Sequence, residues 1–212
     1  MKYKHLIFDF DGVLVESNKI RFDGFRLLFA DYPHDQVQKL VEYAMSNGGM
    51  SRYEKIKYFF EEIRDETISG ASVQVLSRQY TELVKQKVID AEPVKGSLEF
   101  LSSNYTNYDF AIISGSDQDE LREVCQARNI YQLFSKILGS PEKKEINLSR
   151  LLTEEGWEKE SCSFIGDSLN DLEAARINNI DFIARESGLV EWGTMDNITI
   201  ITDLTQLQMH VA

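Results

Sequence analysis

Short apolar runs alternate with segments of helical periodicity over most of the chain. The runs lie near residues 4–9, 109–113, 135–138, 162–166, 180–184 and 198–201. Apolar positions recur at helical spacing in most of the intervals between them, and such alternation is typical of a parallel sheet covered by helices on both faces. The pattern therefore predicts an α/β fold with a Rossmann-like parallel sheet, in which ligands bind beyond the carboxyl ends of the strands.

The interval from residue 17 to residue 94 differs from the rest, because it carries no strong strand signal. Its apolar residues form three stripes at helical spacing, namely Phe22, Phe25, Leu28 and Phe29; Val37, Leu40, Val41 and Ala44; and Val73, Leu76, Tyr80, Leu83 and Val84. Stripes of this kind indicate helices packed around a small core of their own. We therefore expect an α-helical cap at 17–94, inserted into an α/β core made of residues 1–16 and 95–212.

Two carboxylates follow the first predicted strand. Asp9 and Asp11 are two residues apart, so their side chains project to the same side where the strand ends, and Gly12 allows a sharp turn after them. Like charges this close require either a cation between them or a proton on one of them. The pair fits a Mg²⁺ site or a carboxylate nucleophile, and it also fits two solvated acids in a loop.

Two later segments add candidate phosphate ligands. At 114–117 the sequence Ser-Gly-Ser-Asp follows an apolar run, with Ser116 or Asp117 as the expected helix N-cap. The hydroxyl of Ser114 and backbone N–H groups at such a turn can hold phosphate, although a plain strand-to-helix turn explains them equally well. At 139–145 the sequence Gly-Ser-Pro-Glu-Lys-Lys-Glu suggests a helix that opens at Pro141. Lysines are unfavourable in a first helical turn, so Lys143 and Lys144 either face an anion or are neutralised by the flanking glutamates.

A fourth segment carries the strongest single signal. A short apolar run ends at Gly166 and Asp167, and Asp171 follows four residues later. If a helix starts between them, both acids lie near the same strand end. Helix capping accounts for Asp167 or Ser168 and leaves Asp171 unexplained.

Together the four segments resemble those of the haloacid dehalogenase superfamily of phosphohydrolases. The resemblance rests on Asp-Phe-Asp-Gly at 9–12, Ser114, Lys144 in Gly-Ser-Pro-x-x-Lys, and Gly-Asp-Ser-x-x-Asp at 166–171, which span nearly the whole chain in the family's order. The helical insert directly after the first motif is similar to the small-cap branch that holds phosphoglycolate phosphatases and β-phosphoglucomutases. The resemblance implies a phosphatase that acts on a small phosphomonoester, such as a sugar phosphate or phosphoglycolate, through an aspartyl-phosphate intermediate.

The resemblance also implies a role for each motif residue. Asp9 is expected to attack phosphorus, and Asp11 to protonate the leaving oxygen and later deprotonate water, a role that needs a raised pKa. Mg²⁺ is expected to be held by Asp9, by the backbone carbonyl of Asp11 and by Asp167, with Asp171 as a further ligand or as an acceptor for a metal-bound water. The phosphoryl group is expected to be bound by Gly12, Ser114, Gly115 and Lys144. Lys143 is the alternative to Lys144, and the motif spacing favours Lys144.

The cap contributes a separate hypothesis. Gly48 and Gly49 precede Ser51, which is a good helix N-cap, and this capping leaves Arg52 and Lys55 without an assigned role. In the resembling enzymes a cap loop of this kind closes over the substrate. We therefore expect Arg52 and Lys55 to bind an anionic or hydroxylated leaving group; the alternative is that both are solvated surface charges.

Two other functions are compatible with the motifs. A β-phosphoglucomutase-like mutase would share the aspartyl-phosphate chemistry, but Arg21 stands where many of those mutases carry histidine. A non-catalytic metabolite-binding module would lack a nucleophile, an acid or a metal ligand, and all of these are present here.

Charge and hydropathy narrow the choice of partners. The 212 residues carry a formal net charge of −12, which gives no overall electrostatic attraction to nucleic acid or anionic membranes. No apolar run is long enough to span a membrane, and the first residues resemble no signal peptide. We expect a cytoplasmic enzyme whose partner is a small phosphorylated metabolite.

Overall fold

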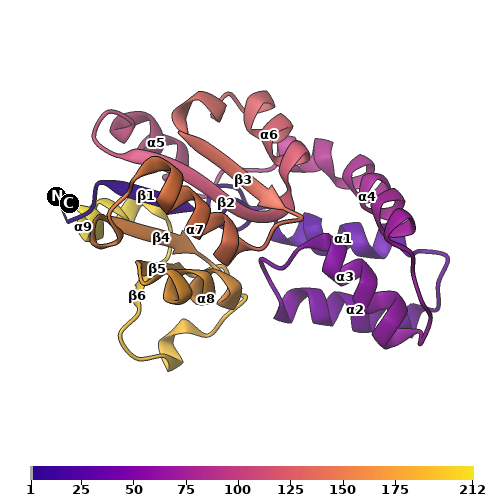
Figure 1. Ribbon diagram of the computed structural model, residues 1–212. Coiled ribbons are helices and arrows are strands. Elements are labelled where there is room, and N and C mark those ends of the chain that lie inside the picture. The colour runs from indigo at the N-terminus through magenta and orange to yellow at the C-terminus, as the bar shows by residue number, and fades with distance from the viewer. Residues whose placement is uncertain (1) are drawn as a thin grey trace.

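The computed structural model describes residues 2–212 and contains one six-stranded parallel sheet (Figure 1). The strands are β1 (His5–Phe8), β2 (Asp109–Asp117), β3 (Lys136–Ser140), β4 (Cys162–Gly166), β5 (Asp181–Arg185) and β6 (Thr199–Ile201), in the order β3-β2-β1-β4-β5-β6. All six predicted strands and the α/β class are confirmed. The order places β1 in the interior of the sheet, between β2, which carries Ser114, and β4, which leads to Asp167, while β3, which leads to Lys144, lies beyond β2.

The register brings the motif-bearing strand ends to one level. Phe8, the last residue of β1, lies opposite Ile112 of β2 and Ile165 of β4. β2 continues beyond the predicted end at Ile113 and reaches Asp117 through a shift in register. The residues that follow these strands therefore meet at the carboxyl edge of the sheet.

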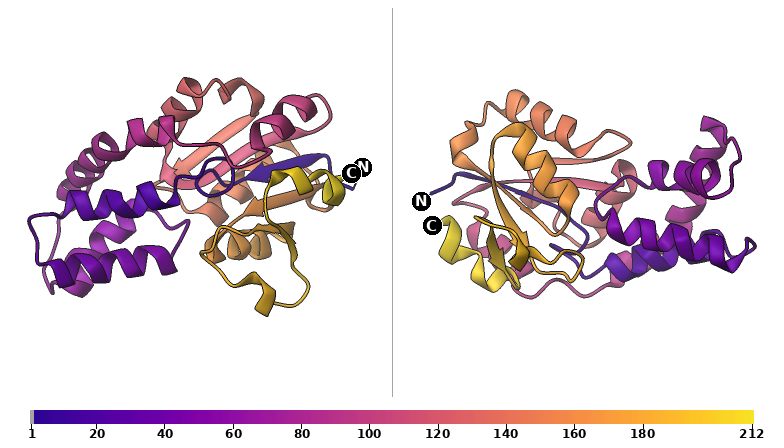
Figure 2. Two further views of the ribbon diagram at one scale, coloured as in Figure 1. Left: turned by 180° about the vertical axis from the view of Figure 1, so that it is seen from behind. Right: turned by 90° about the horizontal axis from the view of Figure 1, so that it is seen from below.

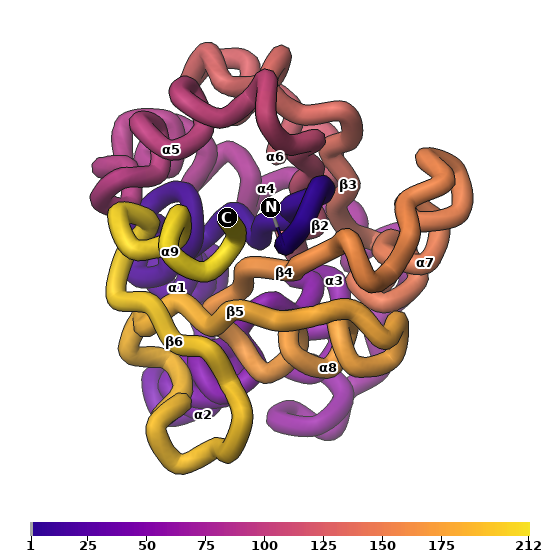
Figure 3. Tube along the Cα trace, turned by 90° about the vertical axis from the view of Figure 1, so that its left-hand side faces the viewer, coloured from indigo at the N-terminus to yellow at the C-terminus, as the bar shows by residue number. Residues whose placement is uncertain are grey.

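Helices cover both faces of this sheet, as Figure 3 shows when the core is viewed along the strands. One face carries α5 (Ser97–Asn104), α6 (Gln118–Ala127) and α9 (Gln208–Val211), and the other carries α7 (Lys144–Glu155) and α8 (Leu169–Asn178). Alternate strand residues pack into the two layers, with Leu6 and Phe8 on one side and Ile7 on the other. These continuous apolar strands are buried because both sheet faces are covered.

The insert after β1 is helical, as expected. It comprises α1 (Asn18–Leu28), α2 (His34–Ser46), α3 (Arg52–Tyr58), a π-helical turn (Phe59–Ile63) and α4 (Gly70–Asp90). The predicted stripes supply its separate apolar core, in which Phe25, Phe29 and Tyr80 are almost fully buried. Figure 2 shows this cap to one side of the core, beyond the end toward which the strands run.

The two segments that join cap and core lie side by side. The Glu16 N–H donates to the Glu92 carbonyl at 2.9 Å, and the Val94 N–H donates to the Leu14 carbonyl at 3.0 Å. The cap boundaries at residues 17 and 94 stay a prediction, although these paired segments flank them closely.

Candidate active site

Three of the four motifs converge at the carboxyl ends of adjacent strands. Asp9 follows β1, Ser114 lies in β2, and Asp167 follows β4. The three residues are nearly inaccessible, at 2%, 1% and 2% exposure. Polar side chains buried this deeply need hydrogen-bond or charge partners. The contacts of these side chains therefore define which ligands the site can hold.

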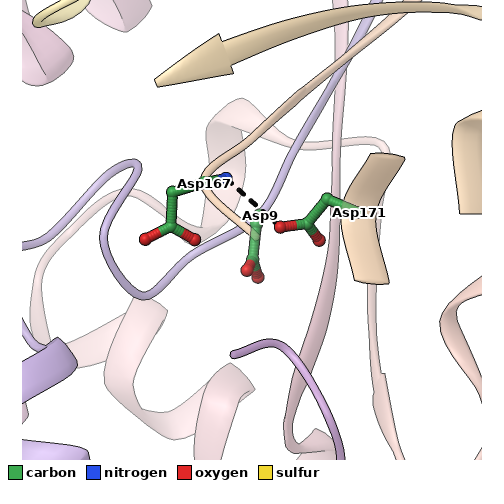
Figure 4. A group of neighbouring side chains, drawn as sticks. All are labelled: Asp9, Asp167 and Asp171. Carbon is green, nitrogen blue, oxygen red and sulfur yellow. Dashed lines mark hydrogen bonds between the residues drawn. The ribbon is translucent and has the colours of Figure 1, made fainter. Parts of the chain in front are cut away.

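Asp9, Asp167 and Asp171 form a compact cluster of carboxylates (Figure 4). Each offers an oxygen, and these oxygens lie within 4.8 Å of one another. Gly166 permits the approach, because a β-carbon at this position would lie 2.3 Å from Cβ of Asp171. Gly12 is similarly required, because its β-carbon would lie 2.0 Å from Oδ2 of Asp167 and its φ is +74°.

Asp171 has a structural role that the sequence did not reveal. Its Oδ2 accepts hydrogen bonds from the backbone N–H groups of Asp167 and Ser168 and from the Ser168 hydroxyl, and with Ser168 it closes a capping box at the start of α8. Helix capping therefore does account for Asp171, contrary to the expectation. Its Oδ1 accepts a hydrogen bond from Nζ of Lys144.

Lys144 supplies a cation to this cluster. Its Nζ lies 2.8 Å from Oδ2 of Asp9 and also donates to Oδ1 of Asp171, and the side chain is 5% exposed. Burial alone would lower the pKa of Lys144, but the carboxylates of Asp171 and Asp9 raise it. Lys143 is exposed, so the structure places Lys144 in the site and Lys143 outside it.

The helix that presents Lys144 starts later than predicted. α7 begins at Lys144 with Lys143 as its N-cap residue, so Pro141 precedes the helix and does not open it. The ammonium group at the first helical position is offset by the carboxylates that it contacts, which removes the expected conflict with the helix dipole.

The buried carboxylates are short of positive charge. Burial raises the pKa of Asp9 to about 8, even though the nearby Lys144 lowers it. Burial, together with the charge of Asp171, raises the pKa of Asp167 to about 7. Carboxylates with raised pKa values indicate that a further cation would be stabilised among them.

Asp11 lies on the cap-facing side of Asp9. Its Oδ1 accepts hydrogen bonds from the Ser17 hydroxyl at 2.5 Å and from Nε of Arg21 at 2.8 Å, and its Oδ2 accepts from the Ser116 hydroxyl at 2.6 Å. Burial alone would raise the pKa of Asp11, but the charge and hydrogen bond of Arg21 and the two hydroxyls lower it. The expectation of a raised pKa at Asp11 was therefore wrong for this conformation.

Ser114 and Gly115 lie between the nucleophile candidate and the cap. The Ser114 side chain is buried and faces the same pocket as Asp9. A β-carbon on Gly115 would lie 2.1 Å from the carbonyl oxygen of Gly49, so the cap loop rests directly on this turn. The Asp117 carboxylate accepts hydrogen bonds from the backbone N–H groups of Asp119 and Glu120, so Asp117, and not Ser116, is the N-cap of α6.

The predicted cap residues Arg52 and Lys55 line the same pocket but have different surroundings. Nη1 of Arg52 donates to Thr81 at 2.7 Å and to the carboxylate of Glu120 at 2.6 Å, so it is not the free charge that the sequence suggested. The Lys55 backbone N–H donates to the Ser51 carbonyl at 3.2 Å, but its side chain forms no hydrogen bond or ion pair within residues 2–212. Burial and the positive charge of Lys144 lower its pKa to about 7.

Sequence reasoning missed two residues of the site. The Asn18 amide donates to Oδ2 of Asp167 at 2.7 Å, which ties the first residue of α1 to the carboxylate cluster. Glu120 ion-pairs with both Arg21 and Arg52 across the boundary between core and cap. Neither lies in a recognisable motif, and Glu120 reads along the chain as an ordinary acid in the first turn of a helix.

The chain has relatives along nearly its full length. Residues 6–185 match the family of haloacid dehalogenase-like hydrolases. A phosphoglycolate phosphatase from Psychrobacter arcticus is 27% identical over 201 residues, which cover 86% of this chain and 83% of the relative. Within residues 2–212, none of the helices combines the length and the apolar character needed to cross a bilayer.

Solved structures share the fold. The structure of a predicted phosphoglycolate phosphatase from Haemophilus somnus superposes with a TM-score of 0.76 at 16% identity, covering 100% of this chain and 99% of the other. A haloacid dehalogenase hydrolase from Bacillus subtilis, determined with bound magnesium, superposes with a TM-score of 0.72 at 18% identity and the same coverage.

Proposed function

The chain belongs to the haloacid dehalogenase-like hydrolases, and on this basis we propose that it is a Mg²⁺-dependent phosphatase of small phosphomonoesters. The observation that carries the proposal is the buried cluster at the end of β1, where Asp9 lies beside Lys144, Asp167 and Asp171. The similarity to the Psychrobacter arcticus phosphoglycolate phosphatase supports a small phosphorylated metabolite as substrate.

The donor set fits magnesium. Mg²⁺ prefers oxygen ligands, and three buried carboxylates supply them in one place. The raised pKa of Asp167 shows that an ionised carboxylate there lacks compensating positive charge. We assign the ion to Asp9, Asp167 and the backbone carbonyl of Asp11, with Asp171 beside them. Bound there, Mg²⁺ would neutralise charge on the phosphoryl oxygens. The magnesium found in the Bacillus subtilis relative is consistent with this assignment.

Asp9 is the proposed nucleophile. A carboxylate oxygen of Asp9 forms a bond to phosphorus while the bond from phosphorus to the leaving oxygen breaks, which gives an aspartyl-phosphate. Water then attacks this phosphorus, and the Asp9 carboxylate is released with inorganic phosphate. Lys144, Ser114 and the backbone N–H of Gly115 would hold the phosphoryl oxygens during both steps.

Asp11 is the proposed proton carrier. It would give a proton to the leaving oxygen in the first step and accept one from water in the second. Its contacts with Arg21, Ser17 and Ser116 favour the ionised form, which suits the second step. The first step therefore requires a state in which Arg21, a cap residue, has withdrawn from Asp11.

The test is Mg²⁺-dependent release of phosphate from p-nitrophenyl phosphate and from a panel of phosphorylated metabolites. Asp9→Asn should abolish release, and intact-mass measurement should detect a phosphoenzyme in the wild type but not in this variant. Asp31→Asn, an exposed position in the cap, is the matched control. Absence of hydrolysis of every phosphomonoester would favour a binding module, and turnover that depends on a bisphosphate primer would favour a mutase.

A further inference from the structure

Arg185, the last residue of β5, reaches the loop that follows β1, although β4 lies between these two strands in the sheet. Its Nη1 donates to the Gly12 carbonyl at 3.1 Å and to Oε2 of Glu16 at 3.3 Å, and its Nη2 donates to Oε1 of Glu16. The arginine is 8% exposed. One buried guanidinium group therefore holds both ends of the segment from Gly12 to Glu16.

Gly12 is the point at which this loop meets the carboxylate cluster. Its φ is +74°, and a β-carbon at this position would lie 2.0 Å from Oδ2 of Asp167 and 2.3 Å from Nδ2 of Asn18. The Gly12 N–H donates to the Val15 carbonyl at 2.8 Å. No backbone N–H within residues 2–212 donates to the Gly12 carbonyl, so Arg185 supplies the hydrogen bond that this buried residue needs.

Stability alone is a weak explanation for a buried arginine here. Its Nε is buried without a hydrogen-bond partner in residues 2–212, and the side chain of its counter-ion, Glu16, is 46% exposed. Taking a guanidinium group out of water costs free energy, and an ion pair with a half-exposed carboxylate recovers only part of that cost. Such local costs are expected where a side chain serves a functional site.

We propose that Arg185 is a positioning residue, which keeps the Asp11 carbonyl where it can bind Mg²⁺. That carbonyl belongs to the peptide group that ends at the Gly12 nitrogen, and glycine lets the peptide groups on either side of it rotate more freely than other residues do. Hydrogen bonds to both the N–H and the carbonyl of Gly12 remove this freedom. Arg185 does not line the pocket that contains Asp9, so it acts through the loop and not on the substrate. The inference rests on the proposed Mg²⁺-dependent function and extends it to a residue outside the pocket.

Calorimetric titration with Mg²⁺ tests the proposal without turnover. Arg185→Ala should weaken Mg²⁺ binding at least about tenfold, as is typical when a residue that orients a metal ligand is removed. Arg185→Lys should lie between the wild type and Arg185→Ala, because an ammonium group lacks the planar fork that reaches Gly12 and Glu16 together. Arg176→Ala, which removes an exposed arginine from the last turn of α8, is the matched control and should bind Mg²⁺ as the wild type does.

Free guanidinium ion should rescue the truncated variant. Millimolar guanidinium chloride, far below denaturing concentrations, should strengthen Mg²⁺ binding by Arg185→Ala, whereas NaCl at the same concentration should not. Guanidinium should leave the affinity of the wild type and of Arg176→Ala unchanged. Release of phosphate from p-nitrophenyl phosphate supplies a second readout. For Arg185→Ala, kcat should fall at limiting Mg²⁺, and at saturating Mg²⁺ both kcat and KM should approach the wild-type values.

The outcomes separate the two proposals. If Arg185→Ala lowers the urea midpoint but binds Mg²⁺ with wild-type affinity, the arginine is only structural and the inference is overturned; if that variant does not fold, Arg185→Lys decides by the same criterion. A loss of affinity that guanidinium does not reverse would overturn it as well. Mg²⁺-dependent hydrolysis by the wild type beside either result leaves the phosphatase proposal standing alone. If the wild type neither binds Mg²⁺ nor hydrolyses any phosphomonoester, both proposals fail.

Discussion

Replacing Lys144 with methionine should destabilise the metal-free protein and make its stability depend on Mg²⁺. The ammonium group lies 2.8 Å from Asp9 and also contacts Asp171, and all three side chains are 5% exposed or less. Removal of one partner from a buried ion pair typically costs about 3–5 kcal/mol. For a chain of this size that corresponds to a melting temperature lower by about 6–20 °C.

The loss should grow with pH. Without Lys144, the pKa of Asp9 would rise further above its already elevated value of about 8. The folded protein would then keep a proton that the unfolded chain releases above about pH 4, so its free energy of unfolding would fall as pH rises from there. Bound Mg²⁺ would replace the missing charge and restore part of the loss, because it binds the folded state only.

Urea unfolding in EDTA and in millimolar MgCl₂, at several pH values, measures both effects. Lys143→Met removes an exposed lysine one residue away and should change the free energy of unfolding by no more than about 0.5 kcal/mol. A cost below about 1 kcal/mol for Lys144→Met in EDTA, or a cost that Mg²⁺ does not reduce, would refute the charge argument.

Three further predictions concern closure, metal binding and pH. Gly115→Ala should lower kcat/KM by at least about 100-fold, because the new methyl group would lie 2.1 Å from the carbonyl oxygen of Gly49 in the cap loop. Steady-state kinetics measure this effect. A loss of less than about threefold would show that activity does not require the contact between the cap loop and Gly115. Asn18→Ala should weaken Mg²⁺ binding about tenfold, since Asp167 loses the amide that orients it; calorimetry that finds equal affinity would contradict this role. In the metal-free wild type, the pKa values of Asp167 and Asp9 are raised to about 7 and about 8, so the folded state keeps protons that the unfolded chain releases at lower pH. The resulting contribution to the free energy of unfolding is fully present at low pH and is lost as pH rises through those values. Urea midpoints in EDTA should therefore fall from about pH 5 to about pH 8, and a midpoint that rises over this range would contradict the assignment.

The strands and the helical insert could be predicted because their signals are local. The interior strands β1 and β4 are apolar runs buried on both faces, and the cap helices carry their own apolar stripes. The order of the strands is not local, since it depends on which edges pair. For the same reason the sequence did not show that β2 continues to Asp117.

The candidate site was predictable to the extent that its residues follow strand ends. Asp9, Ser114 and Asp167 occupy adjacent strands, so their convergence follows from the parallel sheet. The protonation preference of Asp11 was mispredicted, because it is governed by Arg21 from the cap. The spacing of Arg21 was visible in the sequence, but its hydrogen bond to Asp11 was not.

Glu120 marks the limit of sequence reasoning here. A glutamate in the first turn of an amphipathic helix is typical of a solvated residue that favours the helix dipole. It is buried because cap helices from distant parts of the chain dock onto it, with Arg52 lying 68 residues away along the sequence. A contact between the cap and the core is not encoded by the spacing of residues within either segment.

The paired segments at Leu14–Glu16 and Glu92–Val94 make the cap an exchangeable module. The chain leaves the core and returns to it at neighbouring points, held by two backbone hydrogen bonds that any sequence without proline at the donor positions can form. A cap of another length could therefore be spliced in without shifting the sheet register that aligns Asp9 with its partners. Such a replacement would still have to supply the contacts that Asn18 makes with Asp167 and Arg21 makes with Asp11, so the first helix of the cap is the part least free to change.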